Sequence, residues 1–281
     1  MMVSFEQMDL LHVAAGFLVG MLVGLTGVGG GSLMTPMLVL LFGVSPQTAV
    51  GTDLLYAAMT KITGSAVHGW RDTVDWKIVR RLAYGSIPAA LLTLLVLSYV
   101  GTVGASSERV ILLTLAGLLG VTSLAVFFRN RLITFAHDLD PIDPPFKVVF
   151  GTTVLGAVIG VAVTVSSVGA GAIGMTVLLM LYPRLPVVRI VGSDIAHAVP
   201  LALIAGIGHW LIGDVDATLL VNLLIGSIPG VILGSLFSTK ASDKLLQPLL
   251  AIVLALSAWQ LGLKAFAVNK AAPAMDHHRT S

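Results

Sequence analysis

The sequence predicts an all-α polytopic membrane protein made of two homologous halves in inverted orientation, each of about five segments with a broken or re-entrant helix pair. The first observation is composition. The 281-residue chain is 56% hydrophobic and only 11% charged, whereas an average soluble domain has about 25% charged residues. Its mean hydropathy is +0.97. Residues 82–105, 110–128 and 245–263 carry no charged side chain and reach the ~20 residues that are needed to cross hydrocarbon.

The second observation is an internal repeat. Four landmarks of the first half recur in the second, and the members of each pair are 141 residues apart. This constant spacing indicates a duplicated half-protein, far longer than a solenoid unit. The paired landmarks are Gly51-Thr52-Asp53 with Gly192-Ser193-Asp194, His68 with His209, Val74-Asp75 with Val215-Asp216, and Gly85-Ser86-Ile87-Pro88 with Gly226-Ser227-Ile228-Pro229.

Hydrophobicity divides the chain into ten apolar segments, five in each half. The first half comprises residues 1–128 and the second residues 147–265; a polar linker at 129–146, rich in Asp and Pro, breaks the helical pattern between them. A polar tail covers 266–281. The predicted segments are 8–25, 32–42, 46–69, 77–99 and 107–128 in the first half, and 147–165, 171–182, 187–212, 217–237 and 243–265 in the second.

The third observation is charge asymmetry between equivalent connections. Arg71 and Lys77 lie between the third and fourth segments of the first half, whereas the matching connection holds Asp214 and Asp216 and no basic residue. By the positive-inside rule, the first connection is cytoplasmic and the second is not. The halves are therefore predicted to insert in opposite orientations with both termini outside, although Lys264, Lys270 and Arg279 of the C-terminal region oppose this assignment.

Several classes of protein are excluded by composition. The chain has no cysteine, which rules out disulfide scaffolds and Cys-ligated metal centres. No Lys or Arg precedes Lys61, so we expect no secretory signal. The net charge is only +2, and the basic residues are scattered at segment ends. This distribution predicts no nucleic-acid partner. Neither glycine-rich stretch fits a nucleotide-binding pattern, and we expect no cofactor.

The second segment of each half is too short to cross a bilayer. Residues 32–42 follow Gly27-Val28-Gly29-Gly30-Gly31, and residues 171–182 follow Ser166-Ser167-Val168-Gly169-Ala170. Glycines before short apolar segments at equivalent places favour interrupted helices near the midplane, whose free N–H groups form an anion site. The alternative is that these glycines only allow close helix packing. The predicted substrate-binding residues are Gly29, Gly30, Gly31, Ser32, Thr52, Lys61, Gly169, Gly171 and Ser193.

Buried ionisable residues form the second group of candidates. Asp53 and Asp194 lie within apolar segments, where a carboxylate is costly and indicates function. Each is interpreted either as a proton carrier or as a cap on a neighbouring helix N-terminus. Lys61 is either a counter-charge for a bound anion or a partner of these aspartates. His197, three residues after Asp194, is either a proton relay or a hydrogen-bonded bundle histidine.

Other polar landmarks are given structural roles. His68 and His209, beside Trp70 and Trp210, are interpreted as interfacial anchors. Asp75 and Asp216 are expected to cap the fourth segments, which Pro88 and Pro229 should kink.

These motifs together resemble the sulfite exporter TauE/SafE family of membrane permeases over about residues 8–265. The resemblance lies in the Gly-Val-Gly-Gly-Gly break, Gly51-Thr52-Asp53, His68-Gly69 and the Gly-Ser-Ile-Pro helix. It implies transport of small sulfur oxyanions such as sulfite or organosulfonates across the bacterial inner membrane. The second break is poorer in glycine, and its aspartate follows Ser193 instead of threonine.

The leading hypothesis is therefore a secondary transporter, an exporter of a small sulfur-containing oxyanion, and not an enzyme. One repeat would rock against the other, with proton coupling through Asp53, Asp194 or His197 as an option. The alternatives are a passive anion channel and an intramembrane serine hydrolase with Ser32 or Ser167 as nucleophile. A divalent-metal transporter using Asp53, Asp194 and His197 ranks below these, because carboxylates are few.

Overall fold

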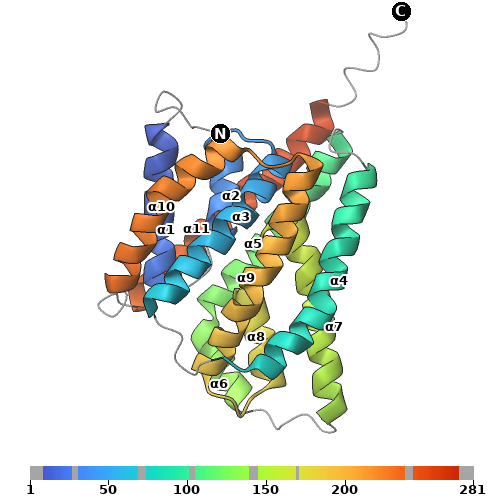
Figure 1. Ribbon diagram of the computed structural model, residues 1–281, viewed down its shortest axis with the longest axis vertical. Helices are drawn as coiled ribbons and strands as arrows, with labels where there is room; N and C mark the ends of the chain where they lie inside the picture. The colour runs from blue at the N-terminus through green and yellow to red at the C-terminus, as the bar shows by residue number, and fades with distance from the viewer. Residues whose placement is uncertain are drawn as a thin grey trace, which may run out of the picture.

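The computed structural model describes residues 9–26, 31–68, 74–100, 105–138, 145–168, 171–237 and 243–271. Apart from short turns and loops, these residues are helical, with no strand among them, and the helices form one bundle (Figure 1). Every predicted apolar segment is a helix with nearly the predicted bounds. In chain order the helices are α1 (Leu10–Thr26), α2 (Gly31–Leu40), α3 (Pro46–His68), α4 (Trp76–Val100), α5 (Ala105–Phe127), α6 (Arg129–His137), α7 (Pro145–Ser166), α8 (Ala172–Leu181), α9 (Val187–Ile212), α10 (Ala217–Phe237) and α11 (Asp243–Ala271).

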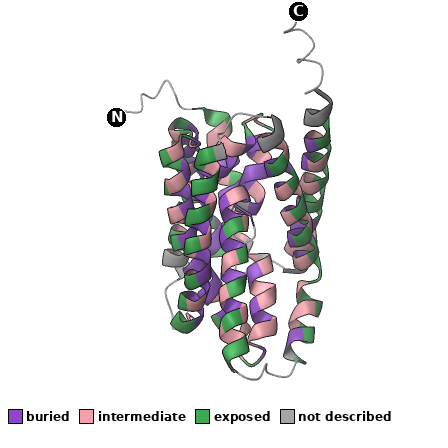
Figure 2. Ribbon diagram, turned by 90° about the vertical axis from the view of Figure 1, so that its right-hand side faces the viewer, coloured by how far each residue is buried: buried purple, intermediate pink, exposed green. Residues whose placement is uncertain are grey.

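Six of these helices are long and apolar enough to cross a membrane: α4, α5, α7, α9, α10 and α11. Their outer faces carry many large apolar side chains, such as Leu95 on α4 and Trp259 on α11, which are 53% and 68% exposed. Figure 2 shows exposed residues along the outside of the bundle and buried ones within it. An exposed apolar surface of this extent is suited to lipid. The chain is a multi-pass membrane protein.

The polar linker contains a helix that the sequence did not predict. Helix α6 occupies its first nine residues, from Arg129 to His137. This stretch contains neither proline nor glycine, and the helix-breaking Pro141 comes only later. The breaking effect of the linker is therefore confined to its second part.

Two parallel helix pairs, α1 with α10 and α4 with α7, pack closely through small residues. In the first pair, a Cβ added to Gly20 would lie within 2.7 Å of the Ser227 Cα; in the second, a Cβ on Gly160 would lie 2.8 Å from the Ser86 Cα. Ser86 and Ser227 are equivalent positions of the repeat, so the same close contact is built twice. Such small-residue contacts bring helix backbones together where no hydrophobic effect is available. Similar approaches occur at Gly16, Gly85, Gly156, Gly226, Gly230 and Gly234.

Helices α3 and α9 carry the repeated motifs and cross at the centre of the bundle (Figure 1). They run antiparallel, because Gly51 near the start of α3 approaches His209 near the end of α9, whereas the later Leu55 approaches Gly206. The middle of this crossing is polar: Thr52, Asp53 and Ser193 are fully buried. Buried polar groups at the centre of an apolar bundle mark the region for chemistry.

The packing gives opposite expectations for two glycines. Gly160→Ala should overpack the α4–α7 contact and destabilise the protein by about 1–3 kcal/mol. Gly120→Ala should be neutral or stabilising by up to about 1 kcal/mol, because a Cβ there meets nothing within 4 Å. Thermal unfolding of both variants in detergent measures the difference. Equal midpoints would contradict the proposed role of the glycine contacts.

Candidate functional site

Two short helices begin near the α3–α9 crossing. Helices α2 and α8 each have ten residues, about 15 Å, or half the hydrocarbon thickness. Their lengths confirm the prediction that these segments are too short to cross a bilayer, while residues 27–30 and 169–170 of the preceding breaks lie outside the described residues. Gly31 is the first residue of α2 and Gly171 is the N-cap of α8. Ser32 is buried, with 8% of its surface exposed. The predicted binding residues Gly29, Gly30 and Gly169 lie outside the described residues.

Asp53 of α3 holds its carboxylate against the first turns of α2. The Thr35 hydroxyl donates a short hydrogen bond to Asp53 Oδ2, and the Thr35 backbone N–H also faces this carboxylate. From the other side the Ser167 hydroxyl faces it, although Ser167 Oγ and Asp53 Oδ1 have no partner at hydrogen-bonding distance. The N-terminal end of a helix attracts negative charge. This geometry favours the capping alternative for Asp53.

Asp194 of α9 has the equivalent relation to α8. Its side chain is buried, and a Cβ added to Gly174 in the first turn of α8 would lie 2.8 Å from Asp194 Oδ1. Oδ1 has no hydrogen-bond partner. Both short helices therefore begin against a buried carboxylate, and among the described residues only the one at α2 accepts a hydrogen bond, from Thr35 to Asp53 Oδ2.

A second polar pair lies one helical turn beyond each aspartate. His197 Nε2 lies 2.7 Å from Ser86 Oγ, and in the equivalent place Tyr56 faces Ser227. All four side chains are at most 1% exposed. His197 Nδ1 has no partner. The first half thus presents a phenol where the second presents an imidazole, whose unpartnered ring nitrogen can take part in hydrogen bonding.

Lys61 lies between the two halves of this cluster. Its charge acts on Asp194, on Asp53 and on His197. Among the described residues, no ion pair shorter than 4.0 Å joins its ammonium to either aspartate. The fold therefore brings together Lys61, Asp53, Asp194 and His197, four of the residues predicted from the sequence. Their roles in binding and proton transfer stay predictions.

Thr52 and Ser193 tie the crossing to the loops before α10 and α4. The Asp216 N–H donates to Thr52 Oγ1 at 3.1 Å, and the Asp75 N–H donates to Ser193 Oγ at 2.8 Å. Asp75 and Asp216 in turn accept hydrogen bonds from N–H groups in the first turns of their helices, at 2.9 Å in both cases. The N-caps predicted at Asp75 and Asp216 are confirmed. The use of Thr52 and Ser193 in substrate binding stays a prediction.

The interpretation of His209 as an interfacial anchor is wrong. Only 3% of its surface is exposed. Its Nδ1 lies 3.1 Å from Asp214 Oδ2 and its Nε2 lies 2.9 Å from the Thr164 carbonyl oxygen, in the last turn of α7. These two acceptors require N–H on both ring nitrogens, or a proton on Asp214. The side chain of His68 lies outside the described residues.

Cationic side chains lie at the opposite ends of the short helices. Lys264 Nζ donates to the Val39 carbonyl oxygen in the last turn of α2, at 3.1 Å. Arg81 Nη1 donates to the hydroxyl of Tyr182, the C-cap of α8, at 3.0 Å. Thr152 also bonds this hydroxyl at 2.8 Å. Positive charge at a helix C-terminus complements the dipole, so each short helix has a cation at one end and a carboxylate at the other.

Several residues of this site were not predicted as binding groups. Thr35, Ser86 and Ser167 are uncharged, and the sequence alone did not show which aspartate or histidine each would face. Ser167 also has a left-handed backbone, with φ of 59°, which is unusual for a residue other than glycine. The repetition of Ser86 as Ser227 was a usable signal for one of them.

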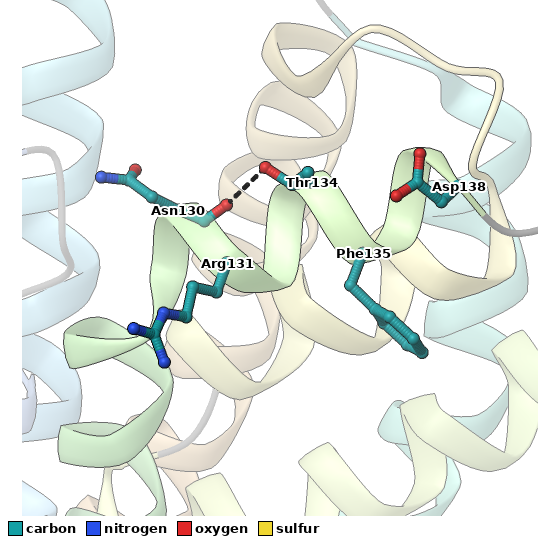
Figure 3. A pocket seen from close by; sticks show the side chains of 5 residues that line it. All are labelled: Asn130, Arg131, Thr134, Phe135 and Asp138. Atoms are coloured by element: carbon teal, nitrogen blue, oxygen red, sulfur yellow. Dashed lines mark hydrogen bonds between the residues drawn. The ribbon is translucent and has the colours of Figure 1, made fainter.

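A surface pocket of about 440 Å³ lies elsewhere, along α6. Figure 3 shows its lining side chains, which come from this single helix and the residue that follows it. None of the predicted site residues lines it. The pocket residues are Asn130, Arg131, Thr134, Phe135 and Asp138.

A multi-pass bundle with interrupted helices that start against buried charged groups defines the class of membrane transport proteins. The chain matches the family model described as sulfite exporter TauE/SafE over residues 12–261. It belongs to that family.

Curated relatives carry matching descriptions. The chain is 37% identical over 258 residues to the probable membrane transporter protein YjnA of Bacillus subtilis strain 168, covering 90% of this chain and 100% of the relative. It is 28% identical over 237 residues to the probable membrane transporter protein YdhB of the same organism, covering 82% and 90%. A similar protein in Methanocaldococcus jannaschii, MJ0441, is 25% identical over 269 residues, covering 89% and 95%. No solved structure is significantly similar to the chain.

The bond between Thr52 and the loop before α10 predicts a stability difference. Thr52→Val should cost about 1–3 kcal/mol, because the Asp216 N–H loses its acceptor in a buried setting. Thr63→Val is the matched control, since the Thr63 hydroxyl bonds only the Met59 carbonyl of its own helix, and should stay within about 0.5 kcal/mol. The measurement is thermal unfolding in detergent. A control that falls as far as Thr52→Val would contradict this role.

Proposed function

We propose that this protein is a secondary transporter that exports a small sulfur-containing oxyanion, such as sulfite or an organosulfonate. The observation that supports this proposal most directly is that α2 and α8 both begin against a buried carboxylate. A carboxylate and a sulfur oxyanion are alike in offering oxygen atoms and negative charge to free N–H groups. Two places built to hold such a charge, with Lys61 near both, are suited to an anionic substrate.

The repeat supports alternating access between inverted halves. Helices α3 and α9 run antiparallel, and the parallel pairs α1–α10 and α4–α7 exchange when the halves are exchanged. Inverted repeats of this kind present one central site to either side of a membrane. The substrate would bind where α2 and α8 begin, contacted by Gly30, Ser32 and Gly171, with Thr52 and Ser193 nearby.

The distribution of basic residues supports an orientation. Helices α4, α7 and α9 begin at the end of the bundle where α6 lies, the lower end in Figure 1. Lys and Arg are concentrated in these starts and in α6, which by the positive-inside rule favours a cytoplasmic location for this end. The location that follows is the bacterial inner membrane. The basic residues are Lys77, Arg80, Arg81, Arg129, Arg131, Lys147 and Arg189.

The driving force would be an ion gradient or the substrate gradient itself. The chain contains no nucleotide-binding motif. Asp53, Asp194 and His197 supply protonatable groups at the centre of the bundle, so a proton gradient is the first coupling to test.

Flux into liposomes tests the proposal. Vesicles that contain the purified protein should take up radiolabelled sulfite or sulfoacetate about tenfold faster than empty vesicles. Movement no faster than in empty vesicles, across both substrates and with pH gradients of both signs, would reject the function. Electrical conductance without counter-transport or proton movement would instead identify a passive anion channel.

Lys61 should contribute to affinity for the anion. Lys61→Met should weaken the apparent affinity in the flux assay by about tenfold, because one unit charge at a distance of about 4 Å contributes roughly 1–4 kcal/mol. Lys77→Met, which removes an exposed lysine at the start of α4, serves as the matched control and should leave affinity unchanged. Unchanged affinity in Lys61→Met would assign that lysine a structural role.

A further inference from the structure

The two aspartates that meet the short helices are not held alike. Asp53 Oδ2 accepts a hydrogen bond from the Thr35 hydroxyl, and the Thr35 N–H and the Ser167 hydroxyl also face its carboxylate. Asp194 Oδ1 is buried, with no hydrogen-bond partner, against the first turn of α8. Its side chain is only 5% exposed. Asp53 Oδ1 has no partner either, but Asp53 keeps the Thr35 bond on its other oxygen. A buried carboxylate oxygen without a partner is costly, and the described residues show no compensating hydrogen bond to Asp194, so Asp194 is the aspartate that gains more by binding a proton.

The groups around Asp194 suit the arrival of a proton. On its own helix, His197 lies one turn away with its Nδ1 unpartnered. From α3, Lys61 is the cation whose charge acts on Asp194, and Lys61 also acts on Asp53. Helices α7 and α8 contribute Ile159 and Gly174, which cannot titrate. Helix α4 contributes Ser86, bonded to His197.

We propose that Asp194 occupies the place of the substrate anion at the start of α8 and vacates it when a proton binds its carboxylate. The anion and one proton then occupy the site together, which makes the protein an anion–proton symporter whose export is driven by the outward gradient of the substrate. Asp53 stays ionised as the fixed cap of α2. This inference rests on the proposed function for its substrate class, but the exchange at α8 is a property of Asp194 alone.

Competition between two negative charges is the physical basis. An ionised Asp194 against α8 repels a second anion from the N–H groups at the start of that helix. A neutral Asp194 removes the repulsion and leaves these N–H groups to the substrate. His197 Nδ1 offers a place for the proton on its way to or from Asp194. The equivalent Tyr56 cannot serve as such a base near neutral pH, which explains why only the second half-site would exchange.

Charge-selective labelling tests the exchange without a transport substrate. The chain has no cysteine, and a Cβ at Gly171, the N-cap of α8, meets nothing within 4 Å. A single cysteine introduced as Gly171→Cys in the full-length protein is labelled with 2-sulfonatoethyl or 2-(trimethylammonium)ethyl methanethiosulfonate. Both reagents react with the same cysteine thiolate, so the fraction of thiolate cancels in the ratio of the two labelling rates. The ratio of the anionic to the cationic rate therefore reports the local electrostatic potential.

Four variants in this background separate charge from position. Asp194→Asn should raise the ratio by about tenfold at pH 8, and the unsubstituted background should approach that ratio as the pH falls to 5. Gly174→Ala keeps the charge but pushes the Asp194 carboxylate away from α8, so it should raise the ratio by a smaller factor. Gly117→Ala, where a Cβ meets nothing within 4 Å, should not change it. Asp53→Asn should change it by less than about twofold.

Every result decides the proposal. It is overturned if the ratio is unaffected by Asp194→Asn and by pH, if Asp53→Asn changes it equally, or if neither reagent labels the cysteine. If Asp194→Asn does not fold, the labelling ratio of Gly174→Ala tests the proposal instead. Absence of sulfite flux with the expected labelling would reject the substrate and leave the exchange at α8 intact. Flux without proton uptake would reject the symport even if labelling followed Asp194.

Discussion

The structure depends on satisfying the backbone of helices that stop inside the bundle. A helix that begins within a membrane exposes N–H groups that lipid cannot bond. In this protein the α3–α9 crossing places a buried carboxylate against the start of each short helix, Asp53 at α2 and Asp194 at α8, where negative charge complements the helix dipole. Cationic side chains meet the opposite ends, through Lys264 and Arg81. The charged residues of the core and the short helices are therefore interdependent, because each short helix has a charged side chain of the complementary sign at each end.

The same constraint explains the character of the site. Burying polar groups at this depth costs free energy, so the same region of the chain serves both the packing of the helices and the proposed chemistry. Thr52 and Ser193 bond the loops before α10 and α4, while their neighbours Asp53 and Asp194 face the short helices. Duplication builds this arrangement twice, and among the positions where the halves differ, Tyr56 is the equivalent of His197. That difference gives the two half-sites different proton chemistry.

The sequence predicted most of the fold because its signals were local or periodic. Apolar length defined the helices, and glycines beside short segments indicated the interruptions. It did not show that Asp53 meets Thr35 or that His197 meets Ser86, since these contacts join residues 18 and 111 positions apart. His209 was misinterpreted because a histidine beside Trp210 at a segment end is typical of an interface, whereas the following turn places Asp214 on its ring. Helix α6 was missed because the polarity and prolines of the linker as a whole outweighed its first nine residues.

The glycine contacts have a consequence for how the bundle can move. Each tight parallel pair takes one helix from either half: α1 with α10, and α4 with α7. Backbones in such close contact cannot slide past one another without losing the contact along their whole length. The closely packed units of this molecule are thus hybrids of the two repeats, so the motion of one half against the other would have to move these hybrid units. Any opening toward one side or the other has to be accommodated between them, where α3 crosses α9 and the short helices begin.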